Sequence, residues 1–156
     1  SVLARDGDIW ERSPAHVAAA REIASRGGYA LIVDYGHSNA AFGDTLQAMR
    51  EHHFHNILES PGEADLTSHV DFESLSRAIG DGGGFAHGPM EQGAFLRAMG
   101  IEVRVARLLQ DANDTQRVHL TDSLDRLTSE AQMGRLFKVM ASAPKAAPAP
   151  YPFGAV

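Results

Sequence analysis

Polar residues with possible chemical roles follow directly on an apolar run in the first third of the chain. The run YALIVDY ends with Asp34 and Tyr35, and Gly36 and His37 come next. A carboxylate could orient a substrate, a histidine can move protons near neutral pH, and glycine permits close approach of the backbone. Because ligands bind beyond the carboxyl ends of parallel strands, these residues form a candidate site. The alternative is a strand end that simply turns, with the aspartate bonding its own loop.

A second group of acids and an imidazole occurs in the segment PGEADLTSHVDF. It contains Glu63, Asp65, His69 and Asp71. Acids and imidazoles this close in sequence can form a metal site or an acid–base pair. The residue types also fit local roles, since Asp71 can cap the helix that follows and Asp65 can stabilise a turn. On the residues alone, the capping interpretation is favoured.

A third group consists of His52, His53 and His55 in EHHFHN. If this segment is a strand, His53 and His55 lie on one face, where two nitrogen ligands for zinc are possible. No HExxH pattern is present, and eight histidines in 156 residues make chance clustering frequent. We therefore expect surface histidines and no metal site.

Composition limits the class of protein. The chain has 156 residues, 44% of them hydrophobic, a formal net charge of −6 and no cysteine. Disulfides and thiolate metal sites are excluded, and the acidic balance argues against a nucleic-acid surface. The sequence contains no apolar run of about 18 residues, so it predicts no membrane span. No secretory signal is visible. These features fit a cytoplasmic protein.

The order of the expected elements indicates an α/β fold. Ser13 and Pro14 resemble a helix start, and YALIVDY has the continuous apolar character of a strand buried on both faces. Asp71 begins a second helix, and Asp114 is expected to cap a later one. Strands are expected in FAHGPM and LFKVMAS, helices over 90–128, and a mixed segment in TLQAMREHHFHNILES. The last residues, 143–156, are rich in Pro and Ala and predict extended chain.

Four motifs in this order resemble the MidA family, the mitochondrial complex I assembly-factor methyltransferases and their bacterial relatives. They are ERSPAHVAAA…GGYALIVDYGH, ESPGEADLTSHVDFESL, GPMEQGAFLRAMGI and MGRLFKVMAS. Together they span nearly all of residues 11–142. PGEADLTSHVDF is long and unusual, which makes the resemblance specific.

The resemblance implies a class I, Rossmann-like methyltransferase fold that uses S-adenosyl-L-methionine. The chain is similar to the C-terminal half of such a domain over 1–142, followed by a tail over 143–156. The last strand is then expected to be antiparallel and to lie between two others. The Gly-rich loop and the acidic strand end that hold the methyl donor are not found in this sequence. We expect them in an N-terminal half encoded elsewhere, and Gly36 is the one residue assigned here to the cofactor.

The family is associated with methylation of a protein arginine on a subunit of respiratory complex I, the NADH dehydrogenase, and with assembly of that complex. The resemblance therefore implies a protein substrate, in the bacterial cytoplasm or, for a eukaryotic member, in mitochondria. Acidic residues could hold the arginine and a histidine could accept its proton. The catalytic candidates are Asp34, Tyr35, His37 and His69, and the substrate-binding candidates are Glu63, Asp65 and Asp71.

Two other functions remain open from the sequence. The first is a non-catalytic interaction module, in which the Asp/His loops and the helical segment 90–128 dock a respiratory-complex subunit. The second and weaker one is a metal-dependent hydrolase that uses the histidines.

Overall fold

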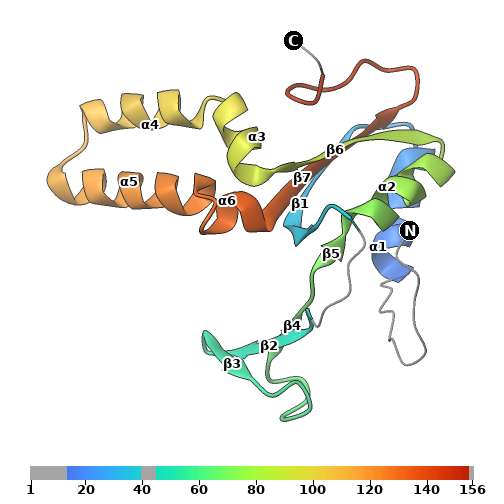
Figure 1. Cartoon of the computed structure of the whole chain (residues 1–156), viewed down its shortest axis with the longest axis horizontal. Coiled ribbons are helices and arrows are strands. Elements are labelled where there is room, and N and C mark those ends of the chain that lie inside the picture. The colour runs from blue at the N-terminus through green and yellow to red at the C-terminus, as the bar shows by residue number, and fades with distance from the viewer. Residues whose placement is uncertain (1–13, 40–44, 155–156) are drawn as a thin grey trace.

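The central strand of the main sheet is the last one in the chain. In the computed structural model, β7 (Phe137–Pro144) lies between β1 (Ala30–His37) and β6 (Gly84–Glu91) and is antiparallel to both (Figure 1). The short β5 (Val70–Asp71) pairs in parallel with the end of β1, which gives the order β5-β1-β7-β6. The predicted α/β fold, with an antiparallel last strand inserted between two others, is confirmed.

The structure describes residues 14–39 and 45–154, and the side chains from 18 onward.

Two helices cover one face of this sheet. Helices α1 (Pro14–Ser25) and α2 (Phe72–Asp81) pack against each other and against the sheet. Their buried side chains form the core with Val70 and Met140, and include Ala20, Ala24, Phe72, Leu75, Ala78 and Ile79. Ser13, the expected cap of α1, lies outside the described residues.

The start of α2 is fixed by a side-chain cap. The backbone N–H of Ser74 donates to Oδ1 of Asp71 at 3.1 Å, and the Ser74 hydroxyl donates to Oδ2 at 2.5 Å. Such a cap satisfies backbone donors that the helix leaves unpaired. The predicted capping role of Asp71 is confirmed.

The sequence predicts that both faces of β1 are buried, but in the structure one face is largely exposed. Ile32 packs against the core, whereas Leu31 is 56% and Val33 46% exposed. One edge of β1 pairs with β7 over 30–35, but within the described residues its other edge pairs only at Gly36 and His37. The prediction of a strand buried on both faces is therefore wrong, because an apolar strand sequence does not reveal which of its faces is covered.

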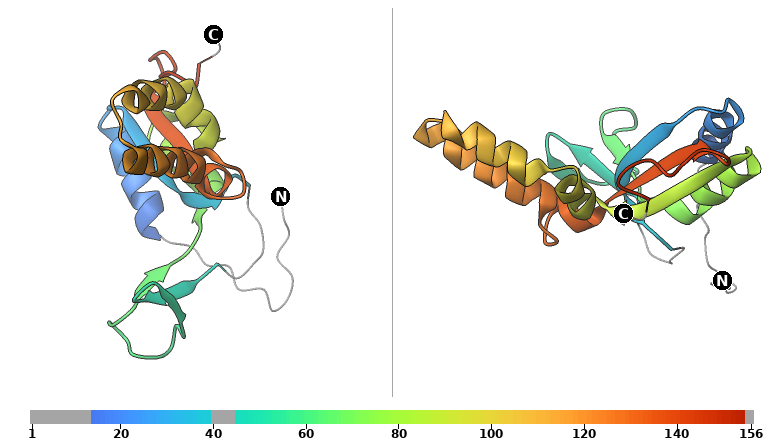
Figure 2. Two further views of the ribbon diagram at one scale, coloured as in Figure 1. Left: turned by 90° about the vertical axis from the view of Figure 1, so that its left-hand side faces the viewer. Right: turned by 90° about the horizontal axis from the view of Figure 1, so that it is seen from above.

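Between β6 and β7 the chain forms a helical arm. It consists of α3 (Gln92–Ala98), α4 (Ile101–Gln110), α5 (Asp114–Thr128) and α6 (Met133–Leu136), and α4 and α5 project together away from the sheet (Figures 1 and 2). The predicted helical segment is confirmed. None of the described helices has the length and apolar character that crossing a membrane requires.

The cap of α5 differs from the expected one. Asn113, not Asp114, precedes the helix and accepts a hydrogen bond from the Gln116 N–H at 3.0 Å. The Gln116 side chain accepts from the Asn113 N–H in return, which completes a capping box. Asp114 is the first residue of the helix, where its negative charge complements the helix dipole.

A small separate sheet follows β1 in the chain. Strands β2 (Gln47–Arg50), β3 (His53–His55) and β4 (Asp65–Thr67) pair in the order β3-β2-β4. Glu51 and His52 form the turn between β2 and β3 with φ of 51° and 65°. Since neither is glycine, the segment lacks the usual hairpin signal and gave only a mixed prediction.

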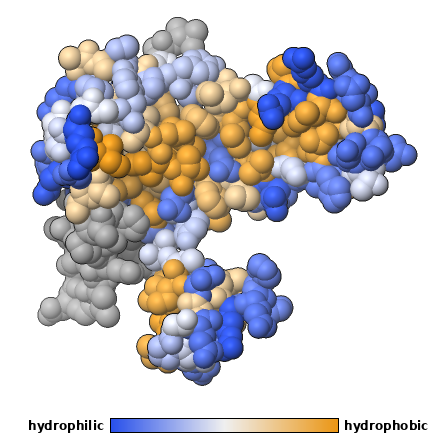
Figure 3. All heavy atoms as spheres, turned by 180° about the vertical axis from the view of Figure 1, so that it is seen from behind, coloured by the Kyte–Doolittle hydropathy of each residue, from blue (hydrophilic) through white to orange (hydrophobic). Residues whose placement is uncertain are grey.

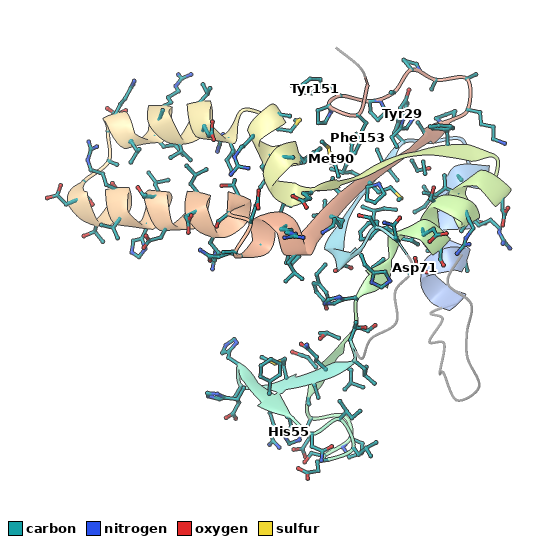
Figure 4. The ribbon with its side chains drawn as sticks, viewed as in Figure 1. Tyr29, His55, Asp71, Met90, Tyr151 and Phe153 are labelled. Carbon is teal, nitrogen blue, oxygen red and sulfur yellow. The ribbon has the colours of Figure 1, made fainter. Side chains whose placement is uncertain are left out.

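The C-terminal residues fold back onto the molecule. The hydroxyl of Tyr151 donates to the Ala98 carbonyl at 2.7 Å, and the ring of Phe153 lies 5.9 Å from that of Phe95. Figure 4 shows Tyr151 and Phe153 beside α3 and β6. Since β7 continues to Pro144, the boundary between a domain and a tail at 142 stays a prediction.

Gly36 allows β1 and β5 to approach closely, and this contact can be tested. A Cβ at position 36 would lie 2.2 Å from the Val70 carbonyl oxygen. We expect Gly36→Ala to reduce the free energy of unfolding by about 3 kcal/mol in urea denaturation. Gly28→Ala is the matched control, because a Cβ there would meet no atom within 4 Å. Equal stability of the two variants would contradict the close packing of β1 on β5.

Candidate functional site

Four aromatic side chains, those of Tyr35, His37, His69 and Phe137, lie close together where β1 ends. The ring centroid of Tyr35 lies 5.9 Å from that of His69 and 5.5 Å from that of Phe137, both edge-on. The rings of His37 and His69 are 6.4 Å apart. Tyr35 and His37 lie on the same side of β1 by strand alternation, and His69 comes from the residue just before β5. The structure therefore brings together three of the four predicted catalytic residues.

His69 is the residue of this cluster with a perturbed pKa. Partial burial lowers its pKa below the ordinary value of 6.5, and the nearby His37 and Lys138 lower it further. Burial disfavours the charged imidazolium, and neighbouring cations repel it. At pH 7 the ring is consequently neutral and able to accept a proton. The backbone N–H of His69 donates a hydrogen bond to the Thr45 hydroxyl oxygen at 3.3 Å.

Asp34, the fourth predicted catalytic residue, lies on the other side of β1. Strand alternation places it on the face of Ile32, and its register partner on β7 is Lys138. Its Oδ1 accepts the Tyr35 N–H at 2.9 Å. Asp34 therefore stabilises the backbone at the end of the strand, while the side chains of Tyr35 and His37 lie on the opposite face of β1.

Of the predicted substrate-binding acids, only Asp71 lies at the cluster. It is the register partner of His37, although its carboxylate already accepts two bonds from Ser74. Asp65 is exposed on β4, and Glu63 forms an ion pair with Arg50 at 2.9 Å in the small sheet. Figure 4 shows Asp71 beside the main sheet and His55 at the far end of the small sheet.

His52, His53 and His55 lie in the turn after β2 and in β3 of the small sheet. His52 and His53 are exposed, and the Nε2 atom of His55 is buried and has no hydrogen-bond partner among the described residues. Among residues 14–39 and 45–154, no three His, Asp or Glu side chains are gathered so that they could hold a metal ion.

Two residues beside the cluster were not selected from the sequence: Phe137, which packs against Tyr35, and Lys138, whose charge lowers the pKa of His69. Lys138 donates to the Arg135 carbonyl, and burial lowers its pKa, an effect that Arg135 adds to and Glu91 opposes. The signal was present, since Lys138 is a single charge within the apolar strand sequence LFKVMAS. A charge in a central strand must reach a polar strand end or a partner.

Comparison with known proteins identifies the family. Residues 1–90 match a family described as "S-adenosyl-L-methionine-dependent methyltransferase". This match covers more than half of the 156 residues. The chain belongs to this methyltransferase family. The resemblance inferred from the four sequence motifs is thereby confirmed, and the family supports S-adenosyl-L-methionine as the cofactor.

Curated relatives of this methyltransferase segment are mitochondrial proteins. Protein arginine methyltransferase NDUFAF7 of Xenopus laevis is 40% identical over 126 residues, and that of Rattus norvegicus is 43% identical over 125 residues. Each alignment covers 80% of this chain and 28% of the relative. The chain thus spans little more than a quarter of the length of these relatives.

Two solved structures share the fold. Both are members of one superfamily from Burkholderia thailandensis, with TM-scores of 0.75 and 0.71 and sequence identities of 29% and 28%. They cover 85% of this chain, which in turn covers 38% and 36% of theirs. The second is bound to S-adenosyl-homocysteine. These likenesses confirm a Rossmann-like methyltransferase fold.

Gly36 is the one residue of this chain that the sequence assigned to the cofactor. The space that the missing side chain of Gly36 leaves is filled by the Val70 backbone, so this glycine does not open a place for a ligand at its Cα. Two hollows in the surface lie elsewhere, one between α4 and α5 and one beside Tyr29 and the tail. The cluster at the end of β1 lies outside both of these hollows.

The electrostatic coupling around His69 gives a direct test. We expect its imidazole to titrate below pH 6.5 by NMR. His37→Asn removes the interaction with His37 that lowers the His69 pKa and should raise this midpoint, whereas His52→Asn, at the exposed turn, should leave it unchanged. Because the unfolded chain binds the proton more readily, stability should fall as the pH drops below about 6.5. A His69 midpoint above 6.5 would contradict the described burial.

Proposed function

We propose that the chain is part of an S-adenosylmethionine-dependent methyltransferase that modifies an arginine of a protein, and that it supplies the acceptor side of the active site. The names of its curated relatives, protein arginine methyltransferases, support the reaction and the substrate class. We extend this to a subunit of respiratory complex I and to a role in its assembly, as the family resemblance implies. The compartment then follows the organism: mitochondria in a eukaryote, the cytoplasm in a bacterium.

The observation that carries this proposal is the cluster of Tyr35, His37 and His69 at the carboxyl end of β1. This end of a parallel strand pair is where open α/β sheets bind their ligands. A guanidinium nitrogen that gains a methyl group must release a proton. His69, neutral at pH 7 because of its lowered pKa, is suited to take that proton. Tyr35 packs edge-on against His69 and would fix the direction of its ring.

Asp71 at the cluster and Asp65 on the small sheet are the carboxylates that would position the cationic arginine. Asp71 lies beside His37 in register, and the exposed Asp65 has no ion-pair partner among the described residues. We propose that these two carboxylates accept charge-assisted hydrogen bonds from the guanidinium. Glu63 would contribute only if it released Arg50. Asp34 would act by holding the strand end through the Tyr35 N–H.

The methyl donor would be held by a further part of the enzyme. The exposed side chains of Leu31 and Val33, and the edge of β1 that β5 leaves unpaired over 30–35, are where further sheet and helix could add. We propose that the donor-binding half docks there and brings S-adenosylmethionine, which supplies an electrophilic methyl group, up to the cluster. Gly36 would then contact the cofactor through its backbone only.

A non-catalytic interaction module is the second candidate. It is favoured by the arm, where Val103 is 75% and Val118 59% exposed. Apolar side chains this exposed on neighbouring helices are typical of a binding surface. The two candidates differ in whether the cluster at the end of β1 is needed for turnover.

Kinetics of the complete enzyme distinguish them. We expect His69→Gln to lower kcat for methylation of an arginine-bearing protein by about 10²–10⁴-fold, while the dissociation constant for S-adenosylmethionine stays the same. His52→Asn, a histidine exchange at an exposed turn, should leave kcat unchanged. Full turnover in both His69→Gln and His37→Asn would contradict the catalytic proposal and favour the interaction module.

A further inference from the structure

A groove runs along the arm between α4 and α5. It has a volume of about 750 Å³, and its apolar floor includes Leu108, Ala112 and Leu120. Leu108 is 45% exposed, and α4 contains no buried residue at all. Figure 3 shows apolar atoms along the arm between hydrophilic ones. The arm therefore presents apolar surface that no described element covers.

Arginines line the same groove. Arg104 and Arg107 stand along α4, and neither side chain has an ion-pair or hydrogen-bond partner among the described residues, whereas Arg97 pairs with Glu102 at 3.5 Å. His119 lies on the facing side of the groove. This cationic lining contrasts with the formal net charge of −6 of the whole chain. The charge of the groove is thus local and opposite to that of the protein.

We infer that this groove binds an amphipathic helix that carries carboxylates, contributed by a partner protein. An apolar floor between two helices is the usual receptor for the apolar face of a third. Arg104 and Arg107 are three residues apart on one helix, so carboxylates at a spacing of three or four on the occupant would face both. The site lies on the arm and is separate from the aromatic cluster at the end of β1.

The charges along the groove also define the direction of the occupant. Asp111 lines the groove beyond Arg107, toward the tip of the arm, where α4 ends. A carboxylate there repels other acids and attracts the positive end of a helix dipole. The amino terminus of the bound helix therefore lies near the tip, and its acidic residues lie nearer the root of the arm.

A pair of peptides tests this inference on the 156-residue chain. The first is a fluorescent 14-residue helix, stapled because short helices are marginal in water, with leucines on one face and glutamates beside them. The second carries lysine at every glutamate position. We expect the acidic peptide alone to raise its anisotropy on binding. The double variant Arg104→Glu/Arg107→Glu should weaken its affinity by about tenfold and gain affinity for the basic peptide.

The matched control is Arg117→Glu/Arg126→Glu, which makes the same change of charge on α5 at positions that do not line the groove. It should leave the affinity for the acidic peptide within about twofold. Binding of neither peptide, equal binding of both, or equal loss in the two double variants would overturn the inference. So would binding to phosphatidylglycerol vesicles that depends on Arg104 and Arg107 without binding of the acidic peptide, since the groove would then contact membranes. Circular dichroism establishes that each variant is folded. The milder Arg107→Gln should still lower the affinity for the acidic peptide by about threefold.

Discussion

The insertion of β7 between β1 and β6 is the constraint on which the rest of the structure depends. Five successive residues of β7, from Val139 to Ala143, are at most 3% exposed. Its pairing with β1 over Ala30–Tyr35 sets which β1 side chains face the helices and which face away. That register places Tyr35 against Phe137 and leaves His37 to meet His69. A shift by one residue would turn these rings to the face of Ile32.

The two sides of this sheet differ in what covers them. Helices α1 and α2 bury one side, while the tail reaches part of the other and Leu31 and Val33 stay exposed. One edge of β1 is also unpaired over most of its length within the described residues. The chain spans 28% of the length of these two curated relatives. We therefore interpret these surfaces as the places where the remaining part of a methyltransferase fold packs.

Local signals in the sequence predicted much of this arrangement. Asp71 followed by apolar residues at helical spacing was sufficient to place α2, and the apolar strand sequences located β1, β6 and β7. The inserted antiparallel β7 came from the family resemblance, because pairing order depends on contacts between distant residues. The hairpin at Glu51 and His52 was missed since its positive φ values fall on residues that rarely adopt them. The cluster was predicted in part: sequence placed Tyr35 and His37 at a strand end, but only the fold brings in Phe137 and Lys138.

The central claim is that this chain supplies the acceptor side of the site, while the methyl donor is held by a different part of the enzyme. A calorimetric titration of the 156-residue chain with S-adenosylmethionine tests this claim most directly. We expect no heat of binding at micromolar concentrations of the donor, because the loop that would hold it is expected in another part of the enzyme and Val70 fills the space at Gly36. Saturable micromolar binding to the chain alone would contradict it.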